Sequence, residues 1–197
     1  MARTIDELVV QIRALETEIE AAYEKKRANL GLVIEDGRIR FGEAVAAQQR
    51  LSKIGLFRWL SGASLMSILV SPVIYAVSIP LALLDLFASV YQAICFPVYG
   101  IAKVKRSDHL IFDRGDLTYL NAIQRFNCNY CAYANGLAGY FREIAARTEQ
   151  YFCPIKHAQR VPTPHDRYPD FFEYGDAEAY RQGLESLQRE LRDAGRE

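Results

Sequence analysis

The hydrophobic and polar positions along this chain place one long apolar stretch between two segments of mixed character. From Trp59 to Ala102 the chain runs for 44 residues with Asp85 as its single charged side chain. One membrane-spanning helix takes about 20 apolar residues, so the stretch is long enough for two. Pro80 lies near its middle, where a tight bend would divide it. The pattern therefore predicts a membrane-embedded helical hairpin of two passes over residues 59–102.

Two other arrangements fit the same apolar stretch: a hairpin that dips into one leaflet only, and the buried core of a soluble protein. The basic residues on its two sides indicate how the apolar stretch is oriented in the membrane, because Lys and Arg accumulate on the cytoplasmic side. They are Arg50, Lys53 and Arg58 before the stretch, and Lys103, Lys105 and Arg106 after it. We therefore expect an integral membrane protein in contact with lipid, with both termini in the cytoplasm.

The N-terminal segment predicts a helix over residues 5–28 with one narrow apolar seam. Thr4 and Glu7 have the spacing of a capping box, which marks a helix start. Apolar residues then recur at alternating intervals of three and four, as in a coiled coil: Ile5, Leu8, Ile12, Leu15, Ile19 and Ala22. The Asp-Gly pair at residues 36–37 stands between β-branched residues and predicts one short β-hairpin.

The C-terminal part predicts two more helices. A spacing of three and four persists over residues 116–152 and indicates a long amphipathic helix. A second heptad seam covers residues 176–194, with Asp176 as its N-cap. The two seams allow packing within one chain, a homodimer, or recruitment of a protein partner through residues 5–28 and 176–194.

These patterns divide the chain into four segments and predict an all-α class. Residues 1–58 hold the heptad helix, the β-hairpin and an amphipathic helix, and residues 59–102 the membrane hairpin. Residues 103–157 carry the long helix, and residues 158–197 an extended segment rich in Pro and aromatic residues, followed by the C-terminal helix. The 24 basic and 24 acidic side chains balance, which argues against a nucleic-acid partner.

Three of the four cysteines, together with one histidine, form the strongest chemical signal. Cys128 and Cys131 are a C-x2-C pair, and Cys153 and His157 a C-x3-H pair. In a cytoplasmic compartment such pairs predict metal ligands rather than disulfides. A Cys3His set suits structural zinc, and an iron–sulfur cluster is the second choice. We therefore predict a membrane-anchored metal-binding module with a structural or sensory role.

The spacing along the long helix decides how such a metal site could form. Cys131 and Cys153 are 22 residues apart, about 33 Å along an unbroken helix. One chain would need a break in the helix at Asn135-Gly136. Alternatively, antiparallel pairing of two copies would bring the C-x2-C pair of one beside the C-x3-H pair of the other, so metal binding would require a homodimer.

Three alternatives remain open at this stage. The cysteines can be inert packing residues, which is common for free cysteines. The chain can be a metal-free membrane adaptor that recruits a partner through its heptad helices. It can also be a small membrane enzyme that uses Cys153 and His157 as a catalytic pair, with Cys153 at the N-terminus of a helix that Pro154 begins. The sequence leaves undecided whether the chain is an enzyme.

Overall fold

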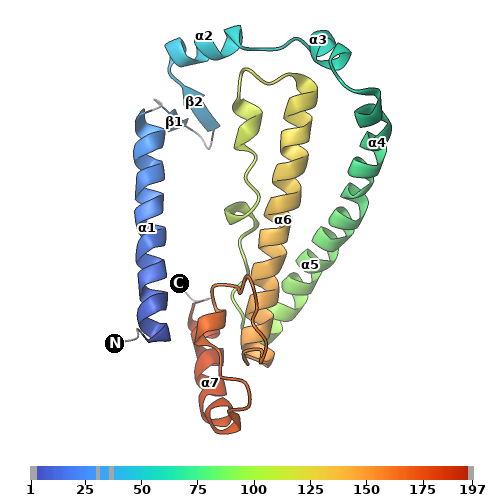
Figure 1. Ribbon diagram of the computed structural model, residues 1–197. Helices are drawn as coiled ribbons and strands as arrows, with labels where there is room; N and C mark the ends of the chain where they lie inside the picture. Colours follow the sequence, from blue (N-terminus) through green and yellow to red (C-terminus); the bar gives the residue numbers. More distant parts are fainter. Residues whose placement is uncertain (1–3, 30–31, 36–37, 195–197) are drawn as a thin grey trace. The chain divides into compact units, whose positions relative to one another are not determined.

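The computed structural model describes residues 4–29, 32–35 and 38–194 and is predominantly α-helical, as the sequence predicts. Its elements form two compact units. The first joins residues 1–63 with residues 113–129, and the second joins residues 64–112 with residues 130–197. The long helix α6 (Ala122–Phe152) contributes its first turns to the first unit and the rest to the second. Figure 1 shows the order of the elements along the chain.

The first unit begins with the long helix α1 and contains two short strands and two short helices. Its elements are α1 (Ile5–Asn29), β1 (Leu32–Glu35), β2 (Arg38–Phe41), α2 (Glu43–Leu51), α3 (Leu56–Ser61) and the 3-10 turn η2 (Asp113–Asp116). The capping box of α1 is confirmed: the Glu7 N–H donates to the Thr4 hydroxyl over 3.3 Å, and the Thr4 N–H donates to the Glu7 carboxylate over 3.0 Å.

β1 and β2 pair antiparallel, with Leu32 opposite Phe41 and Glu35 opposite Arg38. The predicted Asp-Gly turn between them, at residues 36–37, lies outside the described residues. The segment at residues 113–118 is tied to this unit by two hydrogen bonds. The Ile39 N–H donates to the Asp116 carboxylate over 3.3 Å, and the Thr118 hydroxyl donates to the Gln49 side chain over 3.0 Å.

The second unit contains the apolar stretch, and here the prediction of two membrane passes is not confirmed. Helices α4 (Leu65–Ala76) and α5 (Ser78–Tyr99) follow each other with a single turn residue, Val77, between them. The chain keeps its direction there, because the Leu81 N–H donates to the Val77 carbonyl over 3.2 Å. Among the described residues, one helix, Leu65–Tyr99, is long and apolar enough to cross a membrane.

The position of Pro80 explains why the expected bend is not a reversal. Proline interrupts a helix because it lacks an N–H and its ring collides with the preceding turn. Pro80 is the third residue of α5, where the first-turn N–H groups have no partner within the helix in any case. Proline is therefore tolerated at this point, and the apolar stretch continues as one bent helix.

After α5 the chain doubles back along the same helix over residues 101–112, which we call the return segment. Gln92 of α5 is buried, and its side-chain amide forms hydrogen bonds with the return segment. Its carbonyl oxygen accepts from the Val104 N–H over 2.7 Å, and its amide nitrogen donates to the Val104 carbonyl over 3.4 Å and to the Tyr140 hydroxyl. The return segment therefore runs antiparallel to α5 and fills the space between α5 and α6.

The core of the second unit lies between α5, the return segment and α6. Its buried side chains are Ala88, Phe96, Ile101, Val104, Leu110, Leu137, Tyr140 and Ile144. Figure 1 shows α5 beside the later part of α6, and the Tyr91 and Thr148 hydroxyls join the two helices at 3.1 Å. This core covers one side of α5 only, which determines the character of the opposite side.

The predicted long helix is present but begins six residues later than predicted, at Ala122. The Gln124 N–H donates to the Asn121 side chain and the Asn121 N–H to the Gln124 side chain, both over 3.0 Å. This reciprocal pair is a capping box built from Asn and Gln. The apolar periodicity before residue 121 belongs to the preceding loop, so the cap and not the periodicity sets the start of α6.

The C-terminal helix α7 (Ala177–Asp193) packs on α6 through its predicted seam. Asp176 caps it as expected, accepting from the Ala179 N–H over 2.9 Å. Leu187 and Leu191 are buried. Two glutamines complete the contact, Gln150 donating to the Leu187 carbonyl over 3.3 Å and Gln188 to the Tyr151 carbonyl over 2.9 Å.

Candidate functional site

The predicted metal ligands are spread along α6 rather than gathered. Cys128 and Cys131 lie in the first half of α6, which runs unbroken through Asn135 and Gly136. Cys153 directly follows its last residue, 22 residues beyond Cys131. Within the described ranges, no three His, Cys, Asp or Glu side chains gather to hold a metal ion. The prediction of a metal-binding module is therefore wrong, because the unbroken helix keeps its proposed ligands apart within one chain.

The Cys153 and His157 pair also differs from the sequence expectation. Cys153 follows the C-terminal end of α6, with its N–H donating to the Glu149 carbonyl over 2.8 Å, instead of beginning a helix. A helix C-terminus disfavours a thiolate, whereas an N-terminus would stabilise one. The His157 ring stacks against Tyr168 with centroids 6.2 Å apart. Cys153 therefore lies at a helix C-terminus and not at the helix N-terminus that the sequence predicts.

The most unusual surface of the chain is the outer face of α5. Seven large apolar side chains follow one another along it at helical spacing, and each is between 45% and 75% exposed: Ile79, Leu83, Leu86, Phe87, Val90, Ile94 and Val98. Charged residues are missing from this face because the sequence supplies none between Trp59 and Ala102 except Asp85. A continuous apolar face of this length marks a surface that meets lipid or another protein.

Helix α4 extends the apolar surface beyond α5. The structure describes all of α4, and every side chain of this helix is at least partly exposed. The large apolar residues of α4 point in all directions around the helix. The most exposed are Leu65, Met66, Leu69 and Val73. Monomeric soluble proteins rarely expose more than a few hundred Å² of contiguous apolar surface. The α4–α5 surface is therefore the candidate functional site.

Asp85 lies on the opposite side of α5, where the protein itself supplies its partners. Its carboxylate forms an ion pair with Arg106 of the return segment, with one hydrogen bond of 2.7 Å from Nη2 to Oδ2. The Tyr133 hydroxyl of α6 donates over 2.9 Å, and Ser89 donates over 3.4 Å. The single acidic residue of the apolar stretch thus holds the return segment and α6 against the inner face of α5.

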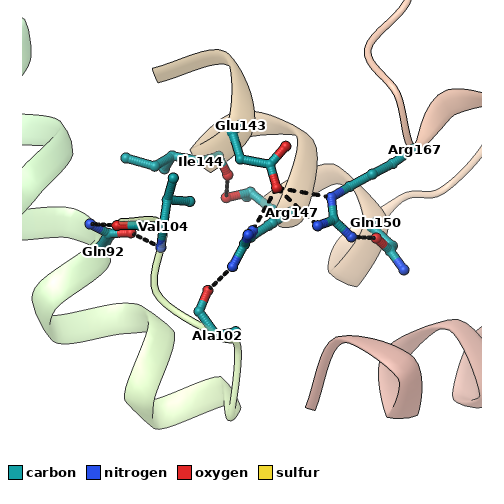
Figure 2. A network of polar contacts seen from close by, with 9 residues as sticks. Gln92, Ala102, Val104, Glu143, Ile144, Arg147, Gln150 and Arg167 are labelled. Atoms are coloured by element: carbon teal, nitrogen blue, oxygen red, sulfur yellow. Dashed lines mark hydrogen bonds and ion pairs between the residues drawn. The ribbon is translucent and has the colours of Figure 1, made fainter. Parts of the chain in front are cut away.

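A second polar cluster holds the segment after α6 in place. Figure 2 shows Glu143 of α6 between two guanidinium groups. Arg147 donates to its carboxylate over 2.8 Å and Arg167 over 2.9 Å. Arg167 also donates to Gln150 over 2.8 Å, and Arg147 donates to the Ala102 carbonyl over 2.6 Å. One carboxylate therefore connects α6, the return segment and the Pro-rich segment.

The two arginines determine the ionisation of Glu143. Burial by itself raises the pKa of this carboxyl group, because it penalises the charged form. The hydrogen bonds from Arg147 and Arg167, with the attraction of both positive charges, outweigh burial and bring the pKa below its usual value. Glu143 is thus ionised at neutral pH and serves as a fixed anion in the polar cluster.

The sequence predicted the apolar residues of this site. It did not predict the polar contacts of Asp85 on the covered face of α5. The partners of Asp85 come from Arg106 and Tyr133, 21 and 48 residues away along the chain. One signal was available: Asp85 and Gln92 are seven residues apart, so they lie on one face of a helix whose opposite face is apolar. That arrangement indicates a helix with protein on one side only.

Comparison with known proteins finds no matching family model, no similar curated protein and no similar solved structure.

Proposed function

We propose that this chain is a monotopic membrane protein, which lies along one leaflet and holds its helical units at the lipid surface. The observation that carries the proposal is the two-sided character of α5. Its outer face presents seven exposed apolar side chains, while its inner face is covered by α6 and the return segment. A helix with one apolar side and one side facing polar protein is suited to the membrane interface.

The charges beside α5 favour this orientation over a transmembrane one. Val104 is bound to Gln92 and Arg106 to Asp85, so residues 103–106 run beside the middle of α5. Lys103 and Lys105 are exposed there. If α5 crossed the bilayer, both ammonium groups would lie near its centre, at a cost of about 2.5–3.5 kcal/mol for each. In the interfacial orientation they stay in water.

The residues flanking the apolar helix support a further part of the proposal. Basic side chains occur on both sides of it, and in a monotopic protein both sides stay in one compartment. We assign that compartment as the cytoplasm, because Lys and Arg are retained on that side. Trp59 and Tyr99, at the ends of the apolar segment, are suited to the headgroup level.

Fluorescence quenching by brominated lipids tests the orientation of α5. Trp59 is the single tryptophan of the chain, so a Trp59→Phe background accepts one probe at a time. Ile79→Trp, Phe87→Trp and Ile94→Trp place probes along the outer face of α5, over about 22 Å of helix. A helix lying in the interface gives all three probes the same depth, and bromines near the headgroups quench them best.

Tyr174→Trp serves as the matched control, because Tyr174 is highly exposed but lies in the segment after α6. This probe should be quenched by none of the brominated lipids. Depths that differ along α5, with Phe87→Trp deepest, would replace the monotopic orientation with a transmembrane one. Failure of all three α5 probes to be quenched would show that a protein, and not lipid, covers the surface.

A further inference from the structure

Helix α1 carries a second exposed apolar surface, made of residues other than those of the α4–α5 surface. From Glu7 to Asn29 every side chain of α1 is exposed except that of Val9, which is partly buried. The seam residues are 43–55% exposed: Leu8, Ile12, Leu15 and Ile19. Helices in water gain most of their stability from packing of an amphipathic face rather than from propensity. A helix of 25 residues with an open seam is therefore incomplete as it stands.

The second heptad seam of the chain does not offer the missing surface. Leu187 and Leu191 of α7 are buried within the second unit, where α7 packs on α6. A seam that is already filled has no apolar face left for another helix. The matching surface with the same repeat is the seam of α1 in a second copy of the chain.

We propose that two copies of the chain associate through α1 as a parallel, two-stranded coiled coil. The residue types at the seam support pairing with a second copy of α1. Ile5, Ile12 and Ile19 occupy the first core position of successive heptads, and Leu8 and Leu15 occupy the second. β-branched residues at the first position with Leu at the second favour two parallel strands over higher oligomers. Lys26 occupies the first core position of the following heptad and ends the apolar core.

The positions beside the seam are compatible with parallel pairing in register. In that arrangement the last residue of one heptad faces the fifth residue of the next heptad in the partner helix. Gln11 then faces Glu16, and Glu18 faces Tyr23. Each is a pairing of a carboxylate with a hydrogen-bond donor, so neither opposes like charges. Antiparallel pairing would instead set the apolar Val9 against Glu16.

The mass of the full chain in detergent, measured by sedimentation equilibrium, tests the association. The wild type should have twice the monomer mass, and Ile12→Lys should reduce it to the monomer mass. Val10→Lys is the matched control, because Val10 is exposed on the side of α1 away from the seam; this variant should remain dimeric. A monomeric wild type, or a dimeric Ile12→Lys variant, overturns the proposal.

Cross-linking tests the direction of pairing in a protein whose seam is almost intact. In a background with the native cysteines replaced, Leu8→Cys should form an intermolecular disulfide on mild oxidation, whereas Val10→Cys should not. Antiparallel pairing would bring residue 8 opposite residue 19, about 16 Å from its counterpart. A dimer that fails to cross-link through Leu8→Cys therefore overturns the parallel arrangement. Because the measurements use detergent, their result is independent of the proposed membrane orientation.

Discussion

At the scale of single residues, Glu143 is the shared partner of two ion pairs that stabilise the fold. Its carboxylate accepts hydrogen bonds from Arg147 and Arg167. Hydrogen bonds to charged groups contribute about 1.5–3 kcal/mol each, and a charge left without its partner is costly. We expect Glu143→Gln to lower the free energy of unfolding by about 1–3 kcal/mol, with the partial exposure of the cluster reducing the effect.

Chemical denaturation followed by circular dichroism measures this loss. Glu185→Gln is the matched control, since Glu185 is an exposed glutamate on α7, and it should change the free energy of unfolding by less than about 0.5 kcal/mol. Equal effects of the two substitutions would mean that the ion pairs around Glu143 do not stabilise the fold.

The lowered pKa of Glu143 also predicts how stability depends on pH. Because the pKa is lower in the folded protein than the ordinary glutamate value of 4.5, the unfolded chain takes up the proton first as the pH falls. The stabilisation is therefore complete above the unfolded pKa and is lost as the pH falls through the folded pKa. The difference in unfolding free energy between wild type and Glu143→Gln should be constant near pH 7 and should shrink below about pH 4.5. Denaturation series across this range measure it, and a pH-independent difference would contradict the prediction.

One of the two ion pairs of Glu143 can be inferred from the sequence. Arg147 follows it by four residues, the spacing of a pair on one helix face, but this spacing does not show whether the pair is buried or exposed. Arg167 lies 24 residues away, beyond the end of α6. Helical spacing carries no information on such a partner, because a loop with several prolines sets its position. The sequence therefore predicts ion pairs between residues that are close along the chain. It does not predict that the cluster is buried.

At the scale of elements, Gly136 explains why α6 continues where a break seemed plausible. The Asn135-Gly136 dipeptide is typical of turns, yet both residues are helical. A Cβ atom at Gly136 would lie 2.6 Å from the His109 carbonyl oxygen and 3.0 Å from the Leu110 Cα. Glycine is needed here because the return segment crosses α6 with its backbone in contact, so the residue serves packing and not chain reversal.

Gly136→Ala should therefore destabilise the protein, although alanine is the better helix former. The colliding atoms belong to the backbone and cannot move aside, and overpacking of this kind costs about 1–3 kcal/mol. Gly139→Ala is the matched control in the same helix, because its Cβ would lie 3.4 Å from the His109 ring. It should be neutral or stabilise by up to about 1 kcal/mol. Thermal denaturation compares the variants; equal stability of both would contradict the close approach at Gly136.

Two helix starts were predictable because a local side-chain cap marks each of them, whereas the cap of α6 was missed. The Thr4–Glu7 box and the Asp176 cap are local interactions, and both are confirmed. The apolar stretch was less predictable, because its composition is the same in one helix or two. Whether Pro80 reverses the chain depends on its place within a helical turn, and the sequence gives that place only when the start of α5 is known.

At the scale of the whole molecule, the apolar stretch provides the lipid contact in the proposed membrane arrangement, and its partners within the chain set the proposed orientation. The sequence identified the stretch and predicted contact with lipid. It could not show that one face of α5 is covered, because the covering residues come from the return segment and from α6. Composition therefore predicts the affinity for a membrane, whereas the geometry of insertion depends on contacts between distant segments.

Two native cysteines offer a direct measure of that geometry. Cys131 and Cys153 are both exposed, on α6 and just beyond its end. They are 22 residues apart, about 33 Å along the helix, which is close to the thickness of the hydrocarbon core. Because α6 lies beside α5, the orientation of α5 decides whether the two thiols face one aqueous compartment.

If α5 lies in the interface, both thiols stay on one side of the membrane. A maleimide that cannot cross membranes, added to sealed vesicles to which the protein has bound from outside, should then label both thiols as fully as it does in detergent. Cys131→Ser and Cys153→Ser, each in a background lacking Cys95 and Cys128, assign the label to one thiol at a time. A transmembrane α5 would carry one of the two thiols into or across the bilayer. Labelling of a single thiol in vesicles, with both labelled in detergent, would therefore contradict the monotopic arrangement.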